Sequence, residues 1–328
     1  MDKLFEAVAA RGPVCVGLDT AADYVPPGER QRASSDAAAI LAFNKAIIDA
    51  TIDAAACFKV QIACYEELGL AGLETYARTL KYLREKKGLV IADIKRGDIA
   101  DTALRYAKSH FEGDFEADFV TLSPYMGMYS IEPWFSYAQS RGKGAFVLMR
   151  TSNRGMRDFE YLELKTDPPA ENAAGAGVPG GSVPPRRLYH AVGDKLAELA
   201  GTRRGVYGYG AFGAVLGCTE REEAAAIRGR YSGLFFLIPG YGAQGGAADD
   251  AALLLRKGNG GVVNASRSIL KAWTAAPGAE NEGAAADNPA GRDGVNNAFA
   301  AEAARGAALE MRDAIRKAVK NRDREEEP

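Results

Sequence analysis

The chain has 328 residues, of which 47% are hydrophobic and 26% are charged, and its formal net charge at pH 7 is −2. This composition is ordinary for a globular protein, and the length suits one barrel-sized domain with insertions. A nearly neutral chain lacks the basic surface that nucleic acids and anionic membranes attract. No apolar run reaches the ~20 residues of a membrane span, and MDKLFEAVAARG lacks the apolar stretch of a signal peptide. We therefore expect a cytoplasmic protein without nucleic-acid or membrane partners.

Cysteine and histidine are scarce, which limits the chemistry available. The chain has four cysteines: Cys15, Cys57, Cys64 and Cys218. They form no C-x-x-C pair, and three lie in or beside apolar runs, so we expect reduced residues of the core. The two histidines, His110 and His190, offer little from which to build a Ser-His-Asp triad or a His-rich metal site.

Eight short apolar runs predict strands. They are Val14–Leu18, Cys57–Ile62, Leu89–Ile94, Phe119–Leu122, Ala145–Met149, Ala214–Gly217, Phe235–Ile238 and Gly261–Asn264. The segments between them mostly have helical spacing, which is clearest over Tyr65–Lys87. Strands that alternate with helices predict a parallel sheet, and eight such units favour a closed (β/α)8 barrel, the TIM-barrel fold, over an open sheet.

Two segments interrupt this alternation. Asp167–Arg187 and Pro277–Asn297 are rich in Pro, Gly and Ala and carry too little apolar surface to pack. We expect one domain over residues 1–328, with flexible surface insertions at about 167–187 and 277–297. A final helix is predicted over roughly Ala298–Val319, followed by the charged tail NRDREEEP.

Charged residues follow three of the predicted strands. Asp19 ends the first in GLD, Lys59 lies in the second, and the third runs into IADIKRGDIADT, which holds Asp93, Lys95 and Asp98. Residues two apart share a face of a strand, so Asp93 and Lys95 should point the same way. In a barrel these positions lie at the carboxyl rim, where active sites are found. The same spacing also fits a structural ion network in which Asp98 only caps the following helix.

The last two predicted strands lead into segments that suit phosphate. The seventh is followed by PGYGAQGG, where glycines let backbone N–H groups approach an anion and Gln244 can donate to a phosphate oxygen. The eighth is followed by Arg267, whose planar guanidinium matches phosphate. Barrels often bind phosphate with these two loops.

Two G-x-G-x-x-G matches begin at Gly208 and Gly240. The first precedes a predicted strand, although the dinucleotide-binding fingerprint follows one. The second has no acidic residue about 20 positions later to hold a ribose. We expect no dinucleotide site.

The run DIKRGDI resembles the D-x-K-x-x-D signature of the orotidine 5'-monophosphate decarboxylase family. GLD, FKVQIACYEELG, LSPYMG, RTSNRG, PGYGAQGG and ASRSI also occur in the order of that family. The resemblance covers about Gly12 to Trp273, apart from the first insertion, and is greatest to the bacterial and protozoan branch. It implies decarboxylation of orotidine 5'-monophosphate (OMP) to uridine 5'-monophosphate (UMP) with no metal and no cofactor.

The resemblance also implies roles for the charged residues. Asp19 and Lys59 would contact the ribose hydroxyls, and Asp93 would lie against the substrate carboxylate. Lys95 would deliver a proton to C6 of the pyrimidine. Asp98 would reach, with Thr102, into the site of a neighbouring subunit, which implies a homodimer with sites completed across the interface.

At the other end of the substrate, the resemblance implies that Ser152 binds the pyrimidine edge. The residues implied for the phosphate end are Pro239, Gln244 and Arg267. On sequence alone, Ser152 could also cap or turn the loop after the fifth strand, and Thr102 could be an ordinary first-turn helix residue. Asn44 fits either a site residue or a helix surface. Tyr241 replaces a small apolar residue of the family, so the shape of the phosphate loop stays open.

Two other functions fit parts of this pattern. Sugar-phosphate decarboxylases and aldolases of the same barrel suprafamily share D-x-K-x-x-D but use Mg²⁺, and a chelator would separate them from a metal-independent enzyme. A barrel that only binds a nucleotide would need the rim charges to be purely structural. The KRGDI context and Ser152 favour the OMP decarboxylase reading.

Overall fold

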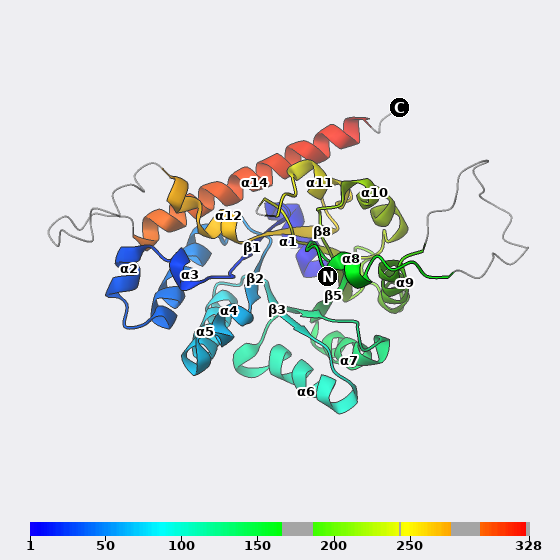
Figure 1. Cartoon of the computed structure of the whole chain (residues 1–328), viewed down its shortest axis with the longest axis horizontal. Helices are drawn as coiled ribbons and strands as arrows, with labels where there is room; N and C mark the ends of the chain where they lie inside the picture. The colour runs from blue at the N-terminus through cyan, green and yellow to red at the C-terminus, as the bar shows by residue number, and fades with distance from the viewer. Residues whose placement is uncertain (166–185, 243, 277–295, 326–328) are drawn as a thin grey trace, which may run out of the picture.

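The computed structural model of the chain describes residues 1–165, 186–242, 244–276 and 296–325. Its eight strands pair in parallel and in chain order, and β8 pairs with β1 to close a barrel. Helices surround the strands (Figure 1), which confirms the predicted TIM barrel. The strands are β1 (Val14–Gly17), β2 (Cys57–Gln61), β3 (Val90–Arg96), β4 (Phe119–Leu122), β5 (Gly144–Arg150), β6 (Phe212–Leu216), β7 (Phe236–Ile238) and β8 (Gly261–Ala265).

Helices and short 3₁₀ turns connect the strands. The α-helices are α1 (Asp2–Arg11), α2 (Pro27–Arg32), α3 (Asp36–Thr51), α4 (Ala63–Glu66), α5 (Gly69–Glu85), α6 (Ala100–Phe111), α7 (Glu132–Arg141), α8 (Met156–Phe159), α9 (Leu188–Gly201), α10 (Arg221–Arg230), α11 (Ala248–Leu253), α12 (Arg267–Leu270) and α14 (Asn297–Glu325). The 3₁₀ turns are η1 (Ala22–Tyr24), η2 (Gly113–Phe115), η3 (Met128–Ser130) and η4 (Ala272–Ala275).

The residues that face the inside of the barrel change character along the strands. Near the amino ends they form a buried apolar cluster, covered by Leu4 and Val8 of α1, that includes Cys15, Cys57, Ile91, Phe119, Phe146, Phe235 and Val262. In a strand, the residue two positions after an inward-facing residue also faces inward. On four strands that next inward residue is polar: Lys59, Asp93, Thr121 and Asn264. The barrel is thus closed by apolar packing at one end and lined by polar groups at the other.

The helix predicted over Tyr65–Lys87 is wrong at its start, because the chain forms α4 and α5 with a break between them. Gly69 begins α5 in the left-handed region, at φ 64°. The chain folds back so closely there that a Cβ on Gly72 would lie 1.9 Å from the carbonyl oxygen of Tyr65. Apolar periodicity marks a buried helix face and gives no sign of such a break, which depends on glycine at both positions.

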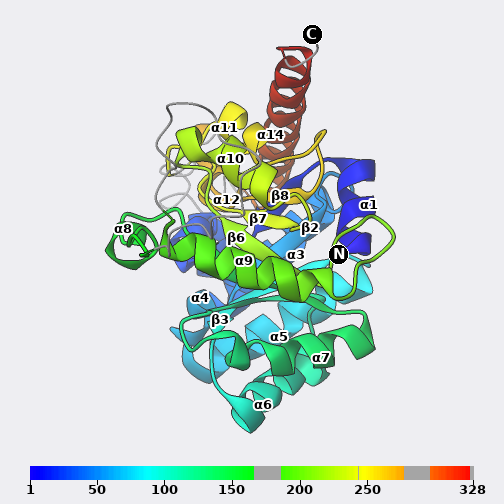
Figure 2. The same cartoon turned by 90° about the vertical axis from the view of Figure 1, so that its right-hand side faces the viewer.

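The last helix is longer than the sequence predicts. It extends to Glu325, so most of the charged tail is helical. α14 packs against α3, α11 and α12 (Figure 1, Figure 2). Arg322 donates to the carbonyl oxygen of Leu255 at 2.8 Å and also to that of Ala252, which ties the last turns to the barrel.

Cys15, Cys57 and Cys218 are buried in the core, as predicted, whereas the prediction is wrong for Cys64, which is partly exposed. All four are free thiols. Among the residues described, no helix is long and apolar enough to cross a membrane. Both predicted insertions lie almost entirely outside the described residues, so their flexibility and the one-domain organisation stay predictions.

Candidate active site

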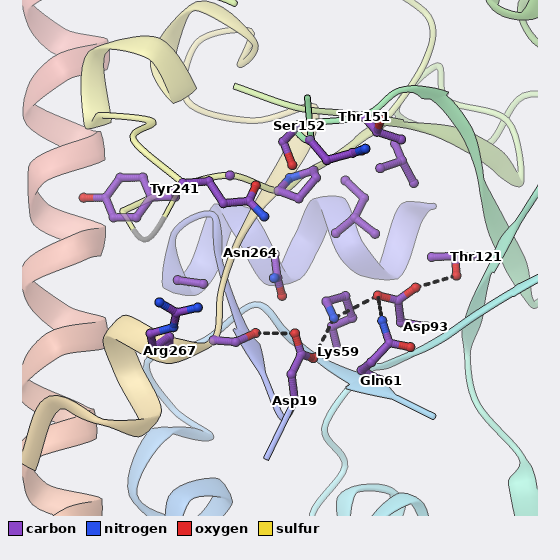
Figure 3. A pocket seen from close by; sticks show the side chains of 18 of the residues that line it. Asp19, Lys59, Gln61, Asp93, Thr121, Thr151, Ser152, Tyr241, Asn264 and Arg267 are labelled. Carbon is purple, nitrogen blue, oxygen red and sulfur yellow. Dashed lines mark hydrogen bonds and ion pairs between the residues drawn. The ribbon is translucent and has the colours of Figure 1, made fainter. Parts of the chain in front are cut away.

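A cavity of about 380 Å³ opens at the carboxyl ends of the strands. Figure 3 shows Asp19, Lys59 and Asp93 along one side of it, Ser152 across from them, and Arg267 at one end. Of the ten residues predicted for the site, eight line this cavity: Asp19, Lys59, Asp93, Lys95, Ser152, Pro239, Gln244 and Arg267. The fold therefore gathers one cavity from loops and strands that are up to about 250 positions apart in sequence.

The charged residues form an array of alternating sign. Lys59 Nζ lies 2.8 Å from Asp19 Oδ1 and 2.9 Å from Asp93 Oδ2, so one ammonium bridges two carboxylates. Lys95 Nζ lies 2.7 Å from Asp93 Oδ1. The order along the array is therefore Asp19, Lys59, Asp93, Lys95, and the predicted shared direction of Asp93 and Lys95 is confirmed.

Burial differs sharply between the two lysines. The side chain of Lys59 is 6% exposed and that of Asp93 is 8% exposed, whereas that of Lys95 is 47% exposed. Burial by itself lowers the pKa of Lys59, but Asp19 and Asp93 outweigh burial and hold that pKa above its ordinary value. Burial raises the pKa of Asp93, but Lys59 and Lys95 outweigh it and hold the pKa below its usual range. Asp93 is thus a buried carboxylate that stays ionised at neutral pH.

The segment after β5 places Ser152 at the cavity. Glu160 accepts hydrogen bonds from both the backbone N–H and the hydroxyl of Thr151, each at 2.8 Å. Arg150 is fully buried and donates to the carbonyl oxygen of Gly217. These contacts fix the two residues that precede Ser152, and Figure 3 shows Ser152 at the cavity.

The phosphate-suited residues lie together at one end of the cavity. Gly240, Gly242 and Gly245 all have positive φ, and the N–H of Gly246 bonds to the carbonyl oxygen of Gly240 at 3.0 Å, which makes a compact turn. Within the described part of the chain, the Arg267 guanidinium has no hydrogen-bond or ion-pair partner. It is an exposed cation available to an anionic group. Tyr241 lines the same end and is half-buried, so its larger side chain is accommodated.

Asp98 and Thr102 do not line the cavity of their own chain. Asp98 is partly exposed and accepts a hydrogen bond from the N–H of Ile99 at 2.8 Å, and Thr102 is exposed in the first turn of α6. The capping role for Asp98 is wrong, because Ile99 occupies the N-cap position and α6 has no side-chain cap. Both side chains are thus at least partly exposed and lie outside the cavity of their own barrel.

Asn44 is neither a site residue nor a surface residue. It is fully buried, accepts a hydrogen bond from Thr20 at 2.7 Å and donates one to the Tyr65 hydroxyl at 2.8 Å. This network fixes α3 against the barrel.

Several polar residues of the cavity were not predicted from the sequence, among them Gln61, Thr121, Asn264 and Ser266. Gln61 donates to Asp93 Oδ2 at 3.1 Å, and Ser266 donates to Asp19 Oδ2 at 2.8 Å. Gln61 could have been predicted, because it lies two residues after Lys59 and so shares its face of the strand. Asn264 and Ser266 are also two residues apart, which suggests a common face. Thr121 carries no such signal, because its contacts are made entirely across strands.

Over the residues that the structure describes, no three or more His, Cys, Asp or Glu side chains are grouped so that they could hold a metal ion. The two carboxylates that face the cavity, Asp19 and Asp93, are separated by the ammonium of Lys59. Their two negative charges are thus already matched by two ammonium groups of the protein, those of Lys59 and Lys95.

Residues 12–280 match the model of the orotidine 5'-phosphate decarboxylase / HUMPS family. The chain belongs to this family. It is 51% identical to the orotidine 5'-phosphate decarboxylase of Clostridium perfringens over 318 residues, covering 97% of this chain and 98% of that one. It is 48% identical to the orotidine 5'-phosphate decarboxylase of Clostridium acetobutylicum, covering 97% and 99%. Membership of the orotidine 5'-phosphate decarboxylase family confirms the resemblance carried by KRGDI and the motifs around it.

Solved structures of the orotidine 5'-phosphate decarboxylase family are also similar. The OMP decarboxylase of Leishmania donovani matches with a TM-score of 0.69 and 28% identity, covering 97% of this chain and 98% of that one. The UMP synthase of the same organism matches with a TM-score of 0.67 and 32% identity, covering 96% of this chain and 56% of that longer one. The similarity extends over nearly the whole barrel.

Proposed function

We propose that this chain decarboxylates OMP to UMP and CO2, the last step of pyrimidine nucleotide synthesis, using the Asp19–Lys59–Asp93–Lys95 array in place of a metal or cofactor. The observation that carries the proposal is a buried, ionised Asp93 beside the half-exposed ammonium of Lys95, at one end of a cavity whose other end holds Arg267. Similarity to curated OMP decarboxylases at about half identity over nearly the full chain supports it.

The chemistry demands this kind of array. When the bond between C6 and the carboxyl carbon breaks, the electron pair stays on C6, where no carbonyl or imine is placed to accept it. Asp93 repels the substrate carboxylate, and this repulsion disappears as neutral CO2 forms. The Lys95 ammonium stabilises the charge growing at C6 and then transfers one of its protons there, becoming a neutral amine. Lys95 is reprotonated from solvent, to which it is open.

The phosphate takes no part in bond breaking, yet it contributes to rate. Contacts of Arg267 and Gln244 with the phosphate, and of Ser152 with the pyrimidine edge, position C6 against Lys95. The loop from Pro239 to Gly246 carries several left-handed glycines, so it can close over the phosphate and exclude water. Binding energy from the phosphate thereby lowers the barrier of the reaction at C6.

The experiment that tests this function follows the absorbance of OMP with purified protein in EDTA, and in parallel with Mg²⁺. We expect the substrate chromophore to disappear and UMP to form in equal amount at the same rate in both buffers. Heat-denatured protein is the control. No turnover in either buffer would refute the proposal, and turnover that requires Mg²⁺ would favour the metal-dependent members of the suprafamily.

We further propose a homodimer whose sites are completed by Asp98 and Thr102 of the partner subunit. Large apolar side chains are exposed near these residues, at the same rim of the barrel: Ile99 (45%), Tyr125 (85%), Met126 (49%) and Tyr129 (61%). Such a patch marks a protein-contact surface. In a two-fold dimer it would meet its own copy, which brings each Asp98 toward the other subunit's cavity.

Co-expression of two inactive variants tests this shared site. Lys95→Ala and Asp98→Asn chains, carrying different tags, should form a mixed dimer in which one cavity has both native residues. About a quarter of the sites in a random mixture are then intact. Activity should recover to that level. The matched control pairs Lys95→Ala with Ser152→Ala, which leaves no intact cavity in any dimer. Equal activity in the two mixtures, or a monomer in solution, would contradict the proposal.

A further inference from the structure

The Thr121 side chain occupies a position that the proposed mechanism does not use. It lies on β4, is 1% exposed and points into the barrel beside Asp93 (Figure 3). Its Oγ1 accepts from the backbone N–H of Ile94 and from that of Lys95, both at 3.0 Å, and donates to Asp93 Oδ1 at 2.8 Å. A hydroxyl has one proton and two lone pairs, so all of its hydrogen-bonding capacity is used.

These three contacts fix where the hydroxyl proton points. Backbone N–H groups can only donate, so both lone pairs of Oγ1 are taken by Ile94 and Lys95. The single proton is therefore directed at Asp93 Oδ1, the same oxygen that Lys95 Nζ contacts at 2.7 Å. Oδ2 receives Lys59 at 2.9 Å and Gln61 at 3.1 Å, so each oxygen of Asp93 has two donors. This arrangement holds the carboxylate in one orientation.

The backbone at Lys95 is in the left-handed region, at φ 44°, which L residues rarely adopt. It lies where the pairing of β3 with β4 shifts register between Ala92 and Arg96. At such a bulge, backbone N–H groups lose their partners in the ladder. The Thr121 hydroxyl replaces the partner for two consecutive N–H groups, and so stabilises the turn that brings the Lys95 side chain back to Asp93.

We propose that Thr121 is a positioning residue that sets the relative orientation of Asp93 and Lys95, and that it acts through them without touching the substrate. The proposal rests on the proposed decarboxylation for its kinetic consequence, but the hydrogen bonds on which it depends can be tested separately. Thr121→Val removes the hydroxyl while keeping the shape of the side chain. Thr121→Ser keeps the hydroxyl and removes only the methyl group.

The kinetic test compares these two variants. Thr121→Val should lower kcat by about 10²-fold, the loss typical of misplaced catalytic groups. KM for OMP and the Kd for UMP should stay near those of the parent chain, because the phosphate end is untouched. Thr121→Ser should restore kcat. Thr75→Val is the matched control, since it removes another buried hydroxyl, bonded to Ala37, away from the cavity. Equal kcat in Thr121→Val and Thr121→Ser would overturn the proposal.

A second measurement does not need activity. Hydrogen exchange of the Ile94 and Lys95 amides should be strongly accelerated in Thr121→Val and unchanged in Thr121→Ser. If the parent chain fails to turn over OMP, the proposed function is refuted, whereas this result still supports or overturns the positioning role. If Thr121→Val does not fold, Thr121→Ala gives the same comparison with Thr121→Ser. Amides that stay protected without the hydroxyl would contradict the proposal.

Discussion

Replacing Lys95 with alanine is expected to abolish turnover of OMP while leaving the barrel folded and UMP bound. Lys95 carries the proton and the charge that the proposed reaction needs at C6, so we expect kcat to fall by at least about 10⁴-fold. The fold should survive, because the Lys95 side chain is 47% exposed and Asp93 keeps Lys59, Gln61 and Thr121 as donors. Single-turnover kinetics with OMP and calorimetry with UMP measure the two effects separately.

Lys95→Arg is the informative companion. The guanidinium keeps the positive charge beside Asp93 but does not give up its proton in proteins. It should therefore be inactive as well, although it preserves the ion pair. The matched surface control is Arg157→Ala, which removes an exposed cation paired with Glu220 and should leave kcat unchanged. Substantial decarboxylation by Lys95→Ala, in protein from a host lacking its own enzyme, would mean that another group donates the proton.

Arg267→Ala should have the next largest effect. It should lower kcat/KM by an amount that corresponds to a loss of about 3–5 kcal/mol of transition-state stabilisation. The guanidinium has no partner within the described residues, so its replacement breaks no contact of the free protein and the loss falls on the complex. The loss should reach kcat as well as KM, because the phosphate contact supports loop closure and thereby the placement of C6.

Steady-state kinetics over a wide range of OMP concentrations separate these contributions. Arg267→Lys should recover part of the loss, since an ammonium supplies the charge without the bidentate geometry. Lys271→Ala is the matched control, because it removes a nearby, partly buried cation that is paired with Asp23. Slightly weaker binding with kcat/KM intact would show that phosphate does not bind at Arg267.

The sequence predicts the barrel and most of the cavity because both depend on residue patterns that repeat over a few positions. Alternation along β2 and β3 places Lys59 and Asp93 on inward faces, and the carboxyl ends of parallel strands meet at one rim, where Lys95 also lies. Glycines after β7 and Arg267 after β8 mark the phosphate end for the same reason.

What the sequence does not predict depends on contacts between strands or on single turns. The left-handed backbone at Lys95 and the hydrogen bonds of Thr121 arise from the register shift between β3 and β4, which no local pattern encodes. The break before α5 depends on how closely Gly72 approaches Tyr65. The sequence suggests a surface or site position for Asn44, because it does not show that α3 packs this residue against Tyr65 and Thr20.

The most direct test of the central claim is a crystal structure of the protein with UMP bound. The account predicts phosphate at Arg267 and Gln244, the pyrimidine edge at Ser152, and C6 about 3–3.5 Å from Lys95 Nζ, the range of reacting atoms. It also predicts that Asp98 of the partner subunit enters the same cavity. Phosphate bound away from Arg267, or C6 turned away from Lys95, would contradict the assignment of the Asp93–Lys95 pair as the centre of the reaction.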